Sequence, residues 1–119
     1  MTIALWIATG VLAALYLLAG FMKATTPYET IGTKMPWVNS FKPSQVKTIG
    51  VLEVLGGLGL VLPQATGILP WLTVVAAFAL VLVQIVAAVV HVRRREFSSL
   101  PINGVLAVFA LAVGVLWLV

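Results

Sequence analysis

One carboxylate, Glu53, lies inside an apolar, glycine-rich stretch at residues 48–63. A charged Asp, Lys or Arg at the centre of a membrane helix costs about 2.5–3.5 kcal/mol on insertion scales, so an acid here needs partners. Gly50 precedes Glu53 by three residues and Gly57 follows it by four, so the three share one helical face, with Gly56 beside it. A neighbouring helix can approach these glycines closely, which would bring partners to Glu53.

The composition indicates that lipid is the solvent of this chain. Of its 119 residues, 62% are hydrophobic and 8% are charged, whereas a soluble domain has about 25% charged residues. A chain this short cannot hide such an excess of apolar side chains in a single soluble core. It has no cysteine and one histidine, which excludes disulfides, thiol chemistry and a clustered His/Cys metal site.

Four apolar stretches are long enough to cross a bilayer, at residues 3–22, 46–62, 69–92 and 102–119. The polar region after the first contains Thr26-Pro27-Tyr28-Glu29, which is typical of a capping box with Thr26 as N-cap. Pro63 is expected to end the second stretch. We therefore predict an all-α membrane protein with a single domain over residues 1–119. Its four transmembrane helices form a compact bundle, with a short interfacial helix between the first and the second.

The basic residues predict the orientation of this bundle. All seven fall in or directly beside the first and third connections between spans: Lys23, Lys34, Lys42, Lys47, Arg93, Arg94 and Arg95. With four crossings these connections share one side, and the positive-inside bias places that side in the cytoplasm and both termini outside it. Because the basic runs adjoin apolar spans, we expect contact with anionic lipids at the three arginines and no binding of nucleic acid.

Polar residues within the spans fall at similar depths. At about 1.5 Å per residue, one level lies roughly 9–10 Å from the basic end and holds Tyr16, Glu53 and Gln84. A second level, nearer the cytoplasm, holds Lys23, His91 and Asn103. We hypothesise that these six side chains line the inside of the bundle, because unpaired polar groups in hydrocarbon are costly.

Structural roles are the alternative for each of these residues. Tyr16 and Gln84 are typical of hydrogen bonds between helices. Lys23 is expected to extend to the headgroups rather than pair with Glu53, and His91 can cap the end of the third helix. A structural lock between Glu53 and either Lys23 or His91 competes with a functional role for the acid.

Three motifs of the chain form a recognisable set. They are Ala-Gly-Phe-Met-Lys at 19–23, Lys-Thr-Ile-Gly-Val-Leu-Glu-Val-Leu-Gly-Gly at 47–57, and Ala-Ala-Val-Val-His-Val-Arg-Arg-Arg-Glu at 87–96, followed by Asn103. Together they resemble the DoxX-like family. The resemblance covers nearly the whole chain and implies a bacterial four-helix protein of the cytoplasmic membrane. It places Lys23, Glu53, His91 and Asn103 at recurring polar positions of the family.

The resemblance implies a function through partners. The family takes its name from a small subunit associated with a thiosulfate:quinone oxidoreductase, and distant eukaryotic relatives act as assembly chaperones for receptors. We therefore expect a non-catalytic subunit or helper of a membrane assembly, such as a redox-related one, that binds a partner membrane protein or further copies of itself. The alternative is a protein that binds a small lipophilic molecule, such as a quinone or a drug-like cation, or transports it coupled to protons. The sequence contains no motif for a cofactor, and the molecule that we expect the protein could bind is a quinone or a lipid.

Overall fold

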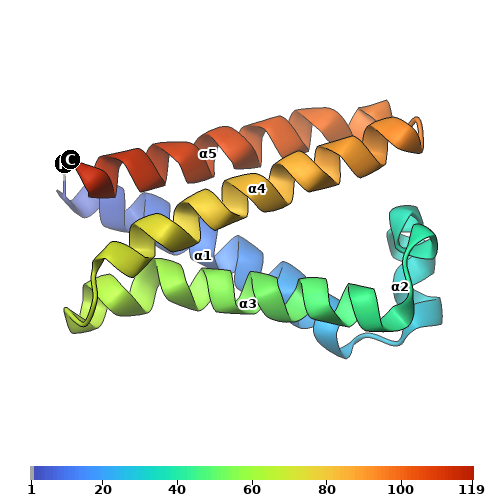
Figure 1. Ribbon diagram of the computed structural model, residues 1–119, viewed down its shortest axis with the longest axis horizontal. Coiled ribbons are helices and arrows are strands. Elements are labelled where there is room, and N and C mark those ends of the chain that lie inside the picture. Colours follow the sequence, from blue (N-terminus) through green and yellow to red (C-terminus); the bar gives the residue numbers. More distant parts are fainter. Residues whose placement is uncertain (1) are drawn as a thin grey trace.

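The computed structural model describes residues 2–119, which form five α-helices and two short 3-10 helices (Figure 1). The four long helices are α1 (Thr2–Thr25), α3 (Pro43–Thr66), α4 (Trp71–Arg93) and α5 (Leu100–Leu118). The short elements are α2 (Tyr28–Lys34), η1 (Pro36–Ser40) and η2 (Phe97–Ser99). No strand occurs within these 118 residues (119 minus Met1), so the predicted all-α class is confirmed, including the short helix between the first two long ones.

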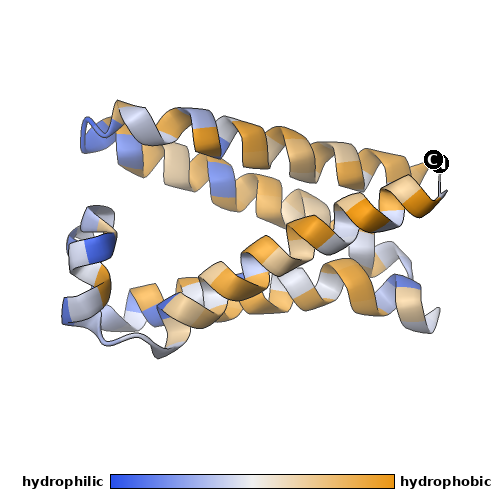
Figure 2. Cartoon of the chain, turned by 180° about the vertical axis from the view of Figure 1, so that it is seen from behind, coloured by the Kyte–Doolittle hydropathy of each residue, from blue (hydrophilic) through white to orange (hydrophobic). Residues whose placement is uncertain are grey.

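All four long helices are apolar enough to span a bilayer. Their outward side chains are large and hydrophobic, and Ile3, Leu18 and Val108 are each about two-thirds exposed or more, at 78%, 71% and 67%. Hydrophilic residues gather instead at the end that carries α2 (Figure 2). Outer faces of this kind suit contact with lipid chains, since a soluble protein rarely exposes such extended apolar surface.

The long helices are arranged as two pairs. α1 packs against α3, α4 packs against α5, and α3 joins the pairs by its contact with α4. The pairs lie close together near the α3–α4 turn and the C-terminus, and they diverge toward the end that carries α2 (Figure 1). The main core, which includes Leu12, Leu60, Ala77 and Val113, fills only the half where the pairs are close.

Glycines bring α1 and α3 into close contact. A Cβ atom on Gly50 would lie 2.6 Å from both the Ala24 nitrogen and the Gly20 oxygen, so no larger residue fits without a shift of the backbone. Gly57, also on α3, lies against Leu17 of α1. Gly56 faces α4, where a Cβ would lie 2.8 Å from a methyl group of Leu80. The three glycines thus pack against helices of the same chain.

The predicted end of the second span is wrong. α3 continues through Pro63 and ends at Thr66, and the next residue, Gly67, has a left-handed φ of 71°. Pro63 has no amide hydrogen to donate to the Gly59 carbonyl four residues earlier. Side chains bind other carbonyls nearby, since Thr73 donates to that of Leu60 and Thr66 to that of Leu62.

The predicted capping box at Thr26 is also wrong. The Thr26 amide still donates to the Met22 carbonyl at the end of α1, and α2 begins after Pro27 without a side-chain cap. The short helix is held in another way, because the Tyr28 hydroxyl donates to the Phe41 carbonyl at 2.6 Å. Ile31, Val38 and Val46 form a small second core beneath it.

Candidate functional site

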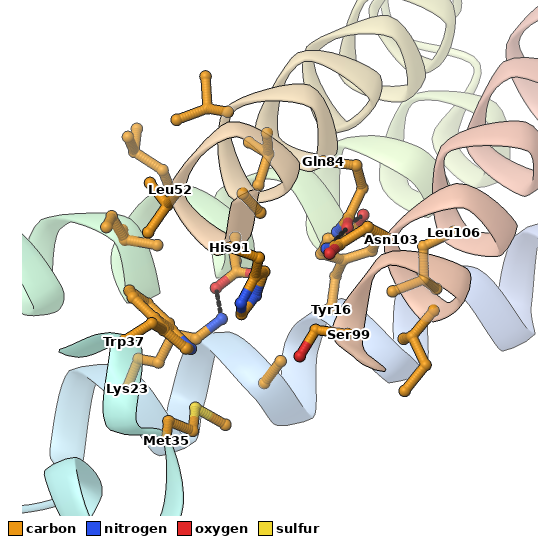
Figure 3. A pocket seen from close by; sticks show the side chains of 18 of the residues that line it. Tyr16, Lys23, Met35, Trp37, Leu52, Gln84, His91, Ser99, Asn103 and Leu106 are labelled. Atoms are coloured by element: carbon orange, nitrogen blue, oxygen red, sulfur yellow. Dashed lines mark hydrogen bonds and ion pairs between the residues drawn. The ribbon is translucent and has the colours of Figure 1, made fainter. Parts of the chain in front are cut away.

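A cavity of about 630 Å³ lies between the two helix pairs, in the half where they diverge (Figure 3). Small-molecule sites in proteins typically measure about 300–1,000 Å³. All six polar residues singled out in the sequence lie on its wall: Tyr16, Lys23, Glu53, Gln84, His91 and Asn103. The rest of the wall is mainly apolar. It includes Met35, Trp37 and Phe41 from the η1 region, which were not predicted as site residues because they are not polar side chains within a span.

Lys23 and Glu53 form a buried ion pair across the α1–α3 contact. The Lys23 Nζ atom lies 2.5 Å from Glu53 Oε1, and the two side chains are 11% and 4% exposed. The same ammonium lies 5.5 Å from the centre of the Trp37 ring, within range of a cation–π contact. The expectation that Lys23 extends to the headgroups is therefore wrong, because the close contact between the two helices brings its amine to the acid.

A chain of hydrogen bonds joins the two helix pairs at the base of the cavity. Gln84 Nε2 donates to the Tyr16 hydroxyl at 2.6 Å, and Asn103 Nδ2 donates to Gln84 Oε1 at 2.9 Å. These side chains come from α1, α4 and α5 and converge in Figure 3. We refer to them as the amide chain.

Depth counting placed Asn103 with Lys23 and His91, but the structure joins it to Tyr16 and Gln84. The depth count was right between the two pairs, since Tyr16 and Gln84 are in contact. It failed within the α4–α5 pair, where Asn103, near the start of α5, lies beside Gln84.

One end of the amide chain lacks a partner. Asn103 Oδ1 is buried and makes no hydrogen bond to any described residue. Arg94 Nε is the other such buried atom between residues 2 and 119, and it lies 3.2 Å from Glu96 Oε2 in an ion pair. Asn103 therefore presents an acceptor that no protein group uses.

The family comparison indicates what kind of protein carries this cavity. The model of the DoxX-like family matches residues 7–113, which is most of the chain. The chain belongs to the DoxX-like family. Together with its four apolar helices, this makes it a multi-pass membrane protein. Comparisons with curated proteins and with solved structures gave no match.

At the end where the helix pairs diverge, this DoxX-like protein has a second polar group that includes His91 of the cavity wall. We call it the mouth cluster: Ser40, His91, Arg94 and Glu96. His91 Nδ1 lies 3.0 Å from Glu96 Oε1, and Arg94 Nη1 donates to the Ser40 hydroxyl at 2.6 Å. Burial raises the pKa of Glu96, but hydrogen bonds from His91 and Arg94 outweigh it and hold that pKa below its ordinary value.

The ion pairs show which of the two predicted locks, Glu53 with Lys23 or Glu53 with His91, this DoxX-like protein contains. Glu53 pairs with Lys23, whereas His91 pairs with Glu96 five residues later. From the sequence, the run that ends in Arg94-Arg95-Glu96 indicated only a basic connection. In the structure the chain reverses at Arg95, whose φ is 58°, and this reversal brings Glu96 back to His91.

Proposed function

We propose that this DoxX-like protein binds a small neutral lipophilic molecule in the cavity between its two helix pairs. The observation that supports this most directly is a cavity of about 630 Å³ whose wall is apolar except for a few converging polar groups. This combination is typical of small-molecule sites, in which apolar contacts supply area and the polar groups fix orientation.

The charges on the wall favour a neutral ligand over a drug-like cation. Glu53 is already paired with Lys23 at 2.5 Å, so its carboxylate is not available as an unpaired counterion. Replacing Lys23 by a ligand cation would leave a buried ammonium without its acid, which is costly. A quinone belongs to the neutral class, whereas a permanent cation does not.

The bilayer itself is the proposed route of entry. Leu15, Leu52 and Val86 line the cavity and are 46%, 55% and 61% exposed. They belong to three different helices. A molecule dissolved in the hydrocarbon region can therefore approach the cavity without crossing an aqueous phase.

The experiment that tests this function uses 1-aminoanthracene, a small lipophilic fluorophore, with the protein in lipid nanodiscs and empty nanodiscs as the blank. We expect a saturable rise in fluorescence above the blank. Ala87→Phe, which fills a position on the cavity wall, is expected to abolish it. Ala79→Phe makes the same change at an exposed position of α4 away from the cavity and should leave it intact.

Two results would contradict the proposal: no saturable signal in the unmodified protein, or equal binding by the two phenylalanine variants. The second would place the dye at the lipid-facing surface.

The helper function expected from the family is left with less support. The glycines of α3 would suit close contact with a partner helix, but Gly50 and Gly57 are packed against α1 of the same chain. Co-purification of a stoichiometric membrane protein would restore the helper function, and a self-associated species would indicate a homo-oligomer.

We further propose that the protein lies in the bacterial cytoplasmic membrane with both termini on the extracytoplasmic side. The support is the distribution of charge, since both connections that carry Lys and Arg lie at the end with α2, where hydrophilic residues gather in Figure 2. Arg93, Arg94 and Arg95 would then lie near the anionic headgroups of the inner leaflet.

A further inference from the structure

We infer that the molecule bound in the cavity carries an O–H or N–H donor, which it gives to the Asn103 amide oxygen. This rests on the proposed function, because it specifies the chemistry of the ligand in that same cavity. The ligand class is a neutral molecule with an apolar body and one polar hydrogen, of which alkylphenols are the simplest examples.

The direction of the amide chain leads to this conclusion. The Asn103 Nδ2 group donates to Gln84 Oε1, and the Gln84 Nε2 group donates to the Tyr16 hydroxyl. Each hydrogen bond therefore points away from Asn103. The chain begins at Asn103 Oδ1, an acceptor with no partner in the described part of the protein.

Asn103 lies on the cavity wall in the membrane-spanning part of the protein and is only 9% exposed. Neighbouring protein atoms cover its Oδ1 atom, so a ligand reaches this oxygen only when side chains of the wall shift on binding. Lipid chains have no hydrogen to donate, and a buried acceptor without a partner carries a desolvation penalty. A ligand that donates to this oxygen removes that penalty, whereas a ligand of the same shape without a donor preserves it.

The neighbouring charged pair does not compete for this role. The Lys23 ammonium is bound to Glu53, and its remaining surroundings include the Trp37 ring. Asn103 and its partner Gln84 carry no charge, so the contact selects for a polar hydrogen rather than for a charge. An analogue that lacks the donor leaves the Asn103 oxygen without a partner and is therefore expected to bind less tightly.

The test compares 4-pentylphenol with its methyl ether, 4-pentylanisole, which has the same apolar body and no donor. Each is titrated calorimetrically into the protein in nanodiscs, with empty nanodiscs subtracted. We expect the phenol to bind roughly 3- to 10-fold more tightly, the range that one neutral hydrogen bond supplies. This comparison uses the unmodified protein and does not depend on the folding of any variant.

Asn103→Leu is the variant that should remove the preference, so that phenol and ether bind equally. Gly104→Ala is its control in the next position of α5, where an added methyl group would meet no atom within 4 Å. The control should retain the preference.

Each outcome has a distinct meaning. Saturable and equal binding of phenol and ether to the unmodified protein would overturn the inference and leave the proposed function intact. Absence of saturable binding for both would overturn the proposed function as well. Tighter binding of 4-pentylacetophenone, an aryl ketone, than of the phenol would show that both amide groups are rotated by 180°, which reverses the amide chain and contradicts a donor on the ligand.

Discussion

At the residue scale, the Lys23–Glu53 pair explains how an acid is accommodated within a membrane helix. Both side chains are buried and their charged atoms are in direct contact. Such pairs often contribute little net stability compared with apolar residues, because two charges must be desolvated. Removal of one partner is nevertheless strongly destabilising, because the other charge is left buried and alone.

Glu53→Gln and Lys23→Met are therefore each expected to lower the free energy of unfolding by about 3–5 kcal/mol. The double variant should recover most of this loss, since neither charge remains. Thermal unfolding in detergent, followed by circular dichroism, measures the effect. Glu29→Gln is the control, because Glu29 is an exposed acid on α2. An unchanged Tm for Glu53→Gln would show that the pair is not a structural lock.

Glu96 gives a prediction for the dependence of stability on pH. Its pKa in the folded protein is held below the ordinary value by His91 and Arg94. The carboxylate form is thus favoured by folding, so its contribution is present above the unfolded pKa of about 4.3 and is lost as pH falls through the folded pKa. We expect Glu96→Gln to reduce the loss of Tm on acidification below about pH 5.

The control for the pH prediction is again Glu29→Gln, whose Tm should fall with acid as in the unmodified protein. If Glu96→Gln follows the same acid curve as that control, the hydrogen bonds in the mouth cluster do not contribute to folding.

At the element scale, the contact between α1 and α3 sets the geometry that positions the ion pair. The backbones approach so closely at Gly20 and Gly50 that a Cβ on Gly50 would meet backbone atoms rather than flexible side chains. Small residues at such crossings are typical of membrane helices, where close packing replaces the hydrophobic effect.

Gly50→Ala is expected to destabilise the protein by about 1–3 kcal/mol, the usual cost of overpacking. Gly10→Ala is the matched control on α1, because its added methyl group would meet nothing within 4 Å. That variant should be neutral or up to about 1 kcal/mol more stable, since alanine favours helix over glycine. Chemical unfolding in mixed micelles compares the two. Equal stability would mean that α1 and α3 can separate without loss.

At the scale of the whole molecule, the sequence predicts the helices and the polar residues well because lipid imposes strict physical demands. A polar side chain such as Glu53, Gln84 or Asn103 cannot be left facing hydrocarbon, so its location inside the bundle follows from its type alone. The partners do not follow in this way. Whether Glu53 pairs with Lys23 or His91 depends on which helices are in contact, and apolar stretches of similar composition do not encode that choice.

The cavity was likewise outside the reach of the sequence. The levels counted along the sequence placed Asn103 apart from Tyr16 and Gln84, and they did not predict a space between the helices. The divergence of the helix pairs opens this space, and Asn103 bonds to Gln84 of the adjacent helix α4. The main core is at the opposite end, around residues such as Leu60 and Ala77.

The orientation of the molecule is open to a direct test, since the chain contains no cysteine. Ala65→Cys lies in the α3–α4 turn region and Ser98→Cys lies in η2, and both positions are exposed. In intact bacterial cells, a membrane-impermeant maleimide should label the first variant at once and the second only after permeabilisation. The reverse pattern would place the basic connections outside the cytoplasm and contradict the proposed orientation.

The uneven filling of the interior has a mechanical consequence. The half near the termini is a packed core, whereas at the open end the Arg94–Ser40 hydrogen bond links the α4 end to η1. A change in the angle between the pairs would therefore widen or narrow the hollow half while leaving the packed half nearly undisturbed. A small rotation of one helix pair about the packed end would therefore let the cavity accept ligands of different widths.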